Sequence, residues 1–170
     1  GDRLLDLGAG EGWVAEALIE WSRAAPRWAC AVDVGSFGLT AAPYVVYDGA
    51  RLPFGDDAFD TTLISLALHH AETAEAVLDE AIRVTRRRLL VVPGGGPFAD
   101  AVRRAWRRRG LGLAAAHRMA LLAMDQYGLL LCDLGRRTVA TADLGVARRT
   151  ARAGKLPVFG TYATFAAVNG

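Results

Sequence analysis

The chain has 170 residues, of which 52% are hydrophobic and 22% charged, and its formal net charge is +2. This composition excludes a disordered chain, and the length predicts one domain over residues 1–170. No apolar run approaches the roughly 18–20 residues that a membrane-spanning helix needs, and the first residues do not form a signal peptide. We therefore expect a folded cytoplasmic protein without a transmembrane segment.

The charges are unevenly distributed along the chain. Residues 1–85 hold five basic and fourteen acidic residues, whereas residues 86–170 hold fifteen basic and four acidic ones. GC-rich coding would explain the many arginines, and the functional interpretations are an anionic substrate, a membrane surface or nucleic acid. The two cysteines, Cys30 and Cys132, lie far apart without a C-x-x-C motif. This argues against a metal site and is consistent with a reducing compartment.

The first predicted element is an apolar strand over Leu4–Leu7 that leads into a turn and then a helix over 12–24. The turn contains three glycines, Gly8, Gly10 and Gly12. Glycine accepts positive φ and has no Cβ, so a ligand can approach the backbone closely, and the helix start offers free N–H groups. The sequence therefore predicts a ligand-binding turn.

The spacing of this turn indicates what kind of ligand it binds. In the dinucleotide motif G-x-G-x-x-G the third glycine would fall at Trp13, which argues against a nicotinamide enzyme. Asp6 and Glu11 place two carboxylates in the turn, where they would repel a pyrophosphate. They favour a ligand with positive charge, such as an ammonium beside a sulfonium.

Four more strands and a helix follow up to residue 93. The strands cover Trp28–Val34, Tyr44–Tyr47, Asp60–Leu68 and Leu89–Val92, and the helix covers 72–84. Only nine residues separate the second and third strands, too few for a full crossover helix. Strands that alternate with helices predict a doubly wound α/β sheet, with its ligand loops at the carboxyl ends of the strands. The ends expected to share one rim are Gly8, Asp33, Asp48, His69 and Pro93.

Beyond Pro97 the predicted elements are a basic helix over 98–109 and an apolar helix over 113–125. The run 127–131 fits a strand or a helix. Two strands are predicted at the end, over 146–152 and 157–168, and the short turn between them makes the pair antiparallel. We expect 98–143 to form a helical, basic, lid-like segment.

Four segments match, in order, those of a known family. They are Asp6-x-Gly8-x-Gly10-x-Gly12, Ala31-Val32-Asp33, Tyr47-Asp48-Gly49-Ala50-x-Leu52-Pro53-Phe54, and Leu68-His69-His70 followed by Glu80-x-x-Arg83-Val84. Over about residues 3–93 the chain resembles the class I S-adenosylmethionine-dependent methyltransferases, especially the small-molecule branch that includes quinone-ring C-methyltransferases. The resemblance implies a mostly parallel Rossmann-like sheet, closed by an antiparallel C-terminal hairpin.

The resemblance also implies S-adenosylmethionine as cofactor and assigns residues to its methionine end. Gly8 and Gly10 would let the backbone pass beside the methionine moiety. Asp6 would hold its ammonium group, directly or through water. Ser65, near the end of the fourth strand, would border the same end.

Three further residues are assigned to the nucleoside by the same resemblance. Asp33 would accept hydrogen bonds from both ribose hydroxyls, since a carboxylate has two oxygens. Asp48 would bind the adenine amino group, and the backbone at Gly49 or Ala50 would meet the ring edge.

Methyl transfer from a sulfonium needs alignment and exclusion of water more than it needs a nucleophile or a metal. This agrees with a sequence that has no nucleophile triad and no metal-ligand set. An acceptor oxygen or carbon must still lose a proton. His69 or His70 is the candidate general base because the ordinary pKa of histidine lies near neutrality.

We therefore interpret the chain as an enzyme that methylates a small molecule. An acceptor that is anionic or membrane-associated would fit the Arg-rich second half of the chain. Two alternatives stay open: a catalytically silent cofactor-fold interaction module, and an RNA methyltransferase that uses the Arg-rich half. Nucleic acid is disfavoured because the fourth strand ends in His69-His70. It lacks the (Asn/Asp/Ser)-Pro-Pro-(Tyr/Phe) signature of base-amine methylation. The sequence leaves the acceptor atom and the oligomeric state open.

Overall fold

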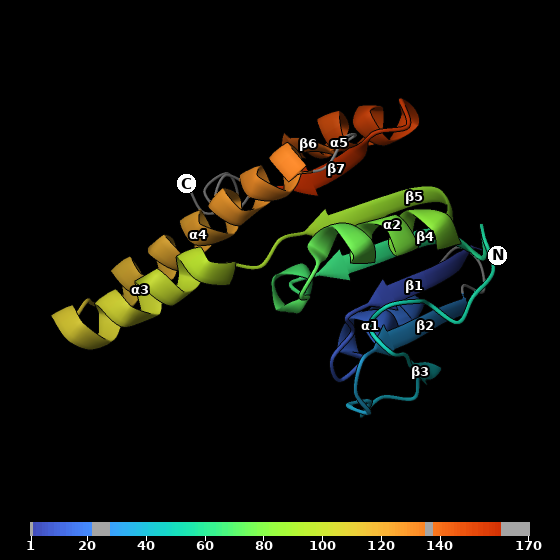
Figure 1. Cartoon of the computed structure of the whole chain (residues 1–170), viewed down its shortest axis with the longest axis horizontal. Helices are drawn as coiled ribbons and strands as arrows, with labels where there is room; N and C mark the ends of the chain where they lie inside the picture. The colour runs from blue at the N-terminus through green and yellow to red at the C-terminus, as the bar shows by residue number, and fades with distance from the viewer. Residues whose placement is uncertain (1, 22–27, 135–137, 161–170) are drawn as a thin grey trace. The chain divides into compact units, whose positions relative to one another are not determined.

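A computed structural model describes residues 2–21, 28–134 and 138–160 (Figure 1). Their contacts fall into two compact units, Gly1–Leu90 and Val91–Gly170, and each is described here by itself. The expectation of one domain over 1–170 stays a prediction.

The first unit is built on a parallel sheet. Its strands are β1 (Arg3–Leu7), β2 (Trp28–Asp33), β3 (Tyr44–Val46), β4 (Phe59–Ser65) and β5 (Thr85–Val92), in the spatial order β3-β2-β1-β4-β5. β1 pairs in parallel with both β2 and β4, and β2 pairs in parallel with β3. The predicted α/β fold with a parallel sheet is therefore confirmed, and the carboxyl ends of these strands lie at one edge.

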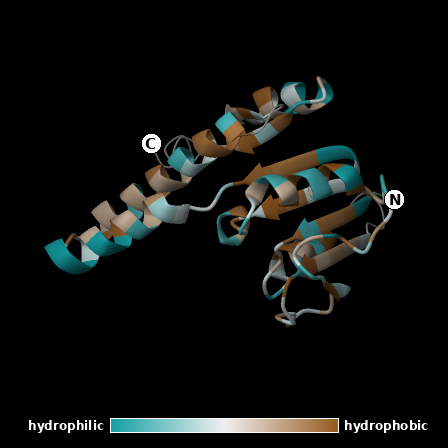
Figure 2. Cartoon of the chain, in the orientation of Figure 1, coloured by the Kyte–Doolittle hydropathy of each residue, from teal (hydrophilic) through white to brown (hydrophobic). Residues whose placement is uncertain are grey.

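The core of this unit lies on both faces of the sheet. Consecutive residues of β1 and β2 are buried, as expected for parallel strands covered on both sides, and most of them are hydrophobic (Figure 2). Helix α1 (Trp13–Trp21) packs Ala15 into a buried cluster with Ala29 and Ala31. Helix α2 (Ala74–Val84) buries three side chains, Leu78, Ala81 and Val84. Of the predicted helix 12–24, Gly12 belongs to the turn before α1 and residues 22–24 lie outside the described residues.

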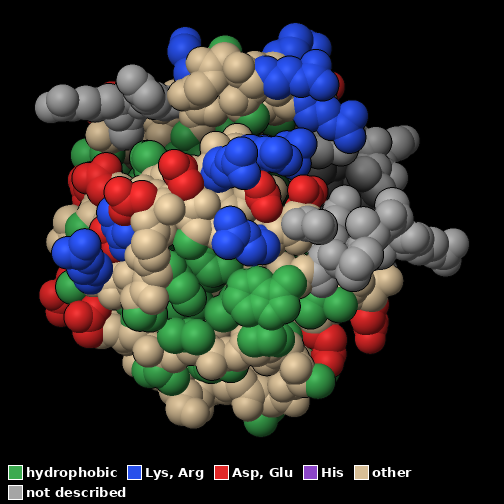
Figure 3. Space-filling view, turned by 90° about the vertical axis from the view of Figure 1, so that its right-hand side faces the viewer, with side chains coloured by type: hydrophobic (Ala, Val, Ile, Leu, Met, Phe, Trp, Pro, Cys, Tyr) green, Lys and Arg blue, Asp and Glu red, His purple; other side chains and the backbone are tan. Residues whose placement is uncertain are grey.

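Some apolar side chains of the first unit stay at the surface. Trp28 is 46% exposed and stacks on Phe59 at a centroid distance of 6.1 Å, and Phe54 meets Phe59 edge-on at 4.8 Å. Figure 3 shows hydrophobic side chains beside acidic and basic ones on one face of the molecule. Single exposed apolar residues of this kind are normal in folded proteins.

Two connections shape the edge formed by the carboxyl ends of the strands. Residues 34–43 link β2 to β3 without a helix, as the short spacing predicts, and the Tyr44 hydroxyl shares its one proton between the carbonyls of Gly35 at 3.0 Å and Gly10 at 2.9 Å. β4 ends three residues earlier than predicted, because Leu66 has a φ of +57°, which a strand cannot continue. The short helix η1 (Leu68–His70) follows it.

The second unit begins with a pair of helices, α3 (Gly96–Arg109) and α4 (Leu113–Leu134), which pack against each other. The run 127–131, for which strand and helix were both open, is helical. β6 (Thr138–Thr141), α5 (Leu144–Arg152) and β7 (Leu156–Phe159) follow.

The predicted antiparallel C-terminal hairpin is wrong. Residues 146–152 belong to helix α5, which starts where the Asp143 side chain accepts the Val146 N–H at 2.6 Å. Because a helix joins them, β6 and β7 can run the same way, and they pair in parallel from Thr138↔Leu156 to Thr141↔Phe159. β7 also pairs in parallel with the end of β5, Val91↔Val158. Most of the predicted strand 157–168 lies outside the described residues.

Candidate cofactor-binding site

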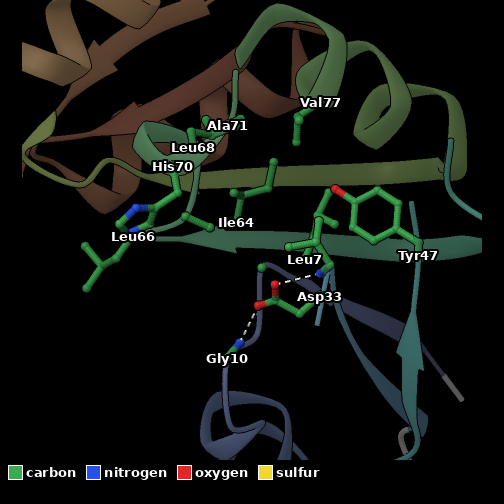
Figure 4. A pocket seen from close by; sticks show the side chains of 13 residues that line it. Leu7, Gly10, Asp33, Tyr47, Ile64, Leu66, Leu68, His70, Ala71 and Val77 are labelled. Atoms are coloured by element: carbon green, nitrogen blue, oxygen red, sulfur yellow. Dashed lines mark hydrogen bonds between the residues drawn. The ribbon is translucent and has the colours of Figure 1, made fainter. Parts of the chain in front are cut away.

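A cavity of about 310 Å³ opens at the carboxyl ends of the strands of the first unit (Figure 4). This volume is at the lower end of the range for small-molecule sites. Most of the lining is apolar, with one carboxylate and one imidazole. The lining residues come from strand ends, loops and α2: Leu7, Gly8, Gly10, Asp33, Val34, Tyr47, Ile64, Leu66, Ala67, Leu68, His70, Ala71 and Val77.

The glycine turn forms one wall of the cavity. Gly8 has a φ of +75° and Gly10 a φ of +54°, in the left-handed region that favours glycine. A Cβ on Gly8 would collide with the Cβ of Ala67, whereas a Cβ on Gly10 would meet nothing within 4 Å. The turn is therefore packed on one side and open at Gly10, where a ligand can reach the backbone.

Asp33, at the end of β2, ties this turn to the sheet. Its Oδ2 accepts the Gly10 N–H at 2.8 Å and its Oδ1 accepts the Val34 N–H at 2.7 Å (Figure 4). The Tyr44 hydroxyl, whose proton lies between the Gly35 and Gly10 carbonyls, is 2.9 Å from the Gly10 oxygen. Each carboxylate oxygen keeps a lone pair for a further donor. The structure thus brings together the predicted residues Gly8, Gly10 and Asp33.

Asp6 lies behind the turn and does not line the cavity. It is only 2% exposed, and its Oδ2 accepts the N–H of Ala15 in the first turn of α1 at 3.1 Å. Burial raises the pKa of the Asp6 carboxyl from 3.8 to about 6; the Ala15 N–H opposes this rise and the charge of Asp33 adds to it. Asp6 can therefore affect a ligand through the position of the turn and through its buried charge.

Asp48 and Gly49 follow β3 at the edge of the cavity without lining it. The exposed carboxylate of Asp48 accepts the N–H groups of Arg51 at 2.8 Å and Ala50 at 2.9 Å, and both bonds lower its pKa below 3.8. Gly49 has a φ of +82°, and a Cβ there would lie 3.4 Å from Val34 Cγ1. Gly49 is therefore next to a residue of the cavity wall.

The two histidines differ in position. His70 is exposed and lines the cavity, whereas His69 is partly buried and does not line it. Their ring centroids are 3.9 Å apart. Ser65, the last residue of β4, is also outside the lining but precedes Leu66, which is in it. Of the two candidate bases, the structure places His70 at the cavity.

Sequence reasoning missed several lining residues. Val34 and Tyr47 are neighbours of the predicted Asp33 and Asp48, so their positions in the motifs were a usable signal. Burial, followed by the charge of Asp33, raises the pKa of Tyr47. Val77 of α2 carried no such signal, because only tertiary packing brings this helix to the cavity.

An ion pair holds the loop that follows Asp48. Arg83 donates to both Glu80 oxygens, at 2.8 and 2.7 Å, and to the carbonyls of Phe54 and Leu52 at 2.8 and 3.1 Å. Glu80 also accepts the Leu52 N–H at 2.9 Å. These contacts, led by the Arg83 hydrogen bonds, lower the pKa of Glu80 from 4.5 to about 2. The matching motif Glu80-x-x-Arg83 therefore fastens one loop beside the site to α2.

Comparison with known proteins agrees with this architecture. The family model described as a methyltransferase domain matches residues 5–92, which is more than half of the chain. The chain belongs to this methyltransferase domain family. Its cofactor is S-adenosylmethionine.

Two curated relatives of this methyltransferase domain are the demethylmenaquinone methyltransferases of Mycobacterium bovis (strain BCG / Pasteur 1173P2) and Mycobacterium tuberculosis (strain ATCC 25177 / H37Ra). Each is 40% identical over 101 residues, covering 56% of this chain and 38% of the relative. The chain therefore spans well under half the length of these relatives. The YcgJ protein of Bacillus subtilis shares the fold, with a TM-score of 0.50 and 22% identity over 73% of this chain and 61% of that one.

The residues at the cavity fit the cofactor of the family. The bare backbone at Gly10 leaves room for a ligand, and Asp33 offers carboxylate lone pairs beside it. Within residues 2–21, 28–134 and 138–160, no helix has both the length and the apolar character needed to cross a membrane.

Proposed function

We propose that this methyltransferase domain transfers a methyl group from S-adenosylmethionine to a small-molecule acceptor. The observation that carries the proposal is the Asp33 carboxylate, bonded to the N–H of Gly10 at 2.8 Å on the wall of a 310 Å³ cavity. When bound, the cofactor supplies the sulfonium methyl group that the acceptor receives.

The methionine end would be held by the glycine turn. Gly8 and Gly10 present backbone where side chains would obstruct the cofactor, and Ser65 borders this end. Asp6 acts as a positioning residue: its bond to Ala15 fixes the turn on α1, and its buried negative charge favours an ammonium group nearby. Direct contact between Asp6 and the ligand is not part of this proposal, because Asp6 does not line the cavity.

The nucleoside would lie beside β2 and β3. Asp33 accepts hydrogen bonds from the ribose hydroxyls through its remaining lone pairs. Val34 and Tyr47 provide an apolar wall for the adenine ring. Gly49 presents its backbone to the ring edge, and Asp48, which keeps an exposed carboxylate, binds the adenine amino group.

The acceptor would be aligned and deprotonated at the other wall of the cavity. His70 lines this wall and accepts a proton from the acceptor atom, and the His69 ring lies beside it, tilted by 39°. The apolar side chains of Leu66, Leu68 and Ile64 exclude water, which favours in-line displacement. His70 is therefore our candidate general base.

The acceptor class is suggested by the relatives, whose printed name is demethylmenaquinone methyltransferase. We propose a quinone-type acceptor of this kind that is anionic or associated with a membrane, supported by the basic residues of the second half. We also propose that the protein works in the cytoplasm, supported by the free thiols of Cys30 and Cys132.

Calorimetry with S-adenosylhomocysteine, followed by methyl transfer to demethylmenaquinone, tests the proposal. We expect the wild type to bind the cofactor product and to turn over. His70→Ala should lower kcat by about 100-fold or more and leave S-adenosylhomocysteine binding unchanged. Binding without turnover on any acceptor would favour the silent interaction module, and turnover on RNA alone would favour the RNA methyltransferase.

A further inference from the structure

The end of the helical pair formed by α3 and α4, yellow in Figure 1, is strongly basic. Residues 101–124 contain six arginines and one histidine and no acidic residue. Arg107, Arg108 and Arg109 form the last turn of α3 and are exposed, and Gly110 ends the helix with a φ of +64°. We call the segment 101–124 the hairpin tip.

Little of this charge is neutralised. Arg103 pairs with Asp100, whereas none of the ion pairs found among the described residues includes Arg104, Arg107 or Arg108. Cations at a helix C-terminus interact favourably with the helix dipole, which accounts for one or two of these arginines. It does not account for the apolar side chains beside them.

Large apolar side chains are exposed on the same tip. Leu113 is 76% exposed, Trp106 46%, Leu122 45% and Met119 38%. Exposed tryptophan and leucine next to a basic helix face are the signature of a helix that lies in a membrane interface. The aliphatic part of an arginine side chain can lie along apolar surface while its guanidinium group reaches a lipid phosphate.

We propose that the hairpin tip docks on the surface of an anionic bilayer. The arginines bind lipid phosphates, and Trp106 and Leu113 enter the boundary between headgroups and acyl chains. The inference deepens the proposed function, whose acceptor is anionic or membrane-associated, by naming the surface that would bring the protein to it.

The hairpin tip combines positive charge with exposed apolar area. This combination favours an anionic bilayer over a nucleic acid or a second copy of the chain. A nucleic acid would bind the arginines but would leave Leu113 and Met119 in water. A second copy of this chain would bring two basic tips together, which costs electrostatic energy. An anionic bilayer satisfies both kinds of side chain.

Cosedimentation with vesicles tests the proposal. We expect binding to vesicles of phosphatidylcholine with phosphatidylglycerol, loss of binding at high salt, and little binding to phosphatidylcholine alone. Arg107→Glu with Arg108→Glu should weaken binding at least tenfold, because each arginine contributes about fivefold. The matched control, Arg148→Glu with Arg152→Glu, makes the same charge change on exposed positions of α5 and should bind nearly as the wild type does.

A second variant tests the apolar part. Leu113→Ser changes a side chain that is 76% exposed, so the fold should be kept, and vesicle binding should weaken severalfold with its salt dependence unchanged. Equal loss of binding in the two double variants would overturn the proposal. The proposal would also be overturned if the wild type bound transfer RNA and not vesicles, and if Arg107→Glu with Arg108→Glu abolished the RNA binding. None of these readouts needs turnover, so failure of wild-type S-adenosylhomocysteine binding would count against the proposed function alone.

Discussion

Asp33 joins the sheet, the glycine turn and the cavity through one carboxylate. Replacing it with Ala removes the acceptor for the Gly10 N–H and the groups proposed to bind the ribose. We expect Asp33→Ala to weaken S-adenosylhomocysteine binding at least tenfold, since hydrogen bonds to a charged group contribute about 1.5–3 kcal/mol each. Isothermal calorimetry measures this change.

The control for this change is Asp79→Ala, which removes an exposed carboxylate of α2 outside the cavity lining. Asp79→Ala should bind as tightly as the wild type. Equal affinities for Asp33→Ala and the wild type would show that Asp33 is not a cofactor ligand.

Asp6 is a residue whose burial opposes stability at neutral pH. Its pKa rises from 3.8 in the unfolded chain to about 6 in the folded one, so the native state binds more protons between these values. The free energy of unfolding should therefore fall by up to about 3 kcal/mol as the pH rises from 4 through 6, and then level off. Asp6→Asn should abolish this fall and be more stable than the wild type at pH 8.

Urea unfolding across this pH range measures the effect of Asp6. Asp60→Asn is a control of opposite sign, because the Arg3 N–H and nearby arginines lower the pKa of Asp60. The contribution of Asp60 is present above pH 3.8 and is lost as the pH falls through its lowered pKa, so its removal should destabilise at neutral pH. A wild-type stability that is flat between pH 4 and 6 would contradict the account of Asp6.

At the scale of elements, the ion pair between Glu80 and Arg83 fastens the loop after β3 to α2. Arg83→Ala leaves the carbonyls of Leu52 and Phe54 and the Glu80 carboxylate without this donor. We expect a fall in Tm of roughly 5 °C or more, measured by thermal unfolding at pH 7. Arg103→Ala, which breaks the exposed pair with Asp100 on α3, should change Tm by much less.

The same pair predicts a pH dependence. Because the pKa of Glu80 is lowered from 4.5 to about 2, its stabilising effect is complete above pH 4.5 and is lost as the pH falls toward 2. In Arg83→Ala this part of the acid dependence should be greatly reduced. An acid unfolding curve unchanged from that of the wild type would show that the pair contributes little.

At the scale of the whole molecule, the two units differ in charge as well as in contacts. Gly1–Leu90 holds eight basic and fourteen acidic residues, and Val91–Gly170 holds twelve basic and four acidic ones. All residues that line the cavity belong to the first unit. The cavity proposed to bind the cofactor and the basic hairpin tip therefore belong to different parts of the chain.

Hydrogen exchange can follow both parts at once. S-Adenosylhomocysteine should slow amide exchange in the segments that line the cavity, 7–10, 33–34 and 64–71, because bound ligand stabilises them against local opening. If segment 98–143 acts as the predicted lid, exchange should slow in α3 and α4 as well. Unchanged exchange in α3 and α4 would contradict the lid, and unchanged exchange in 7–10 would contradict the site.

Local patterns in the sequence determined the glycine turn, the strand that ends at Asp33 and the alternation of strands and helices, because each depends on residues a few positions apart. Tertiary structure alone decided that β6 and β7 run parallel, since strand pairing depends on what lies between the strands and beside them. It also decided that Asp6 turns to Ala15 and that His70, not His69, lines the cavity. Burial and side-chain direction are set by distant segments, and no short stretch of sequence contains them.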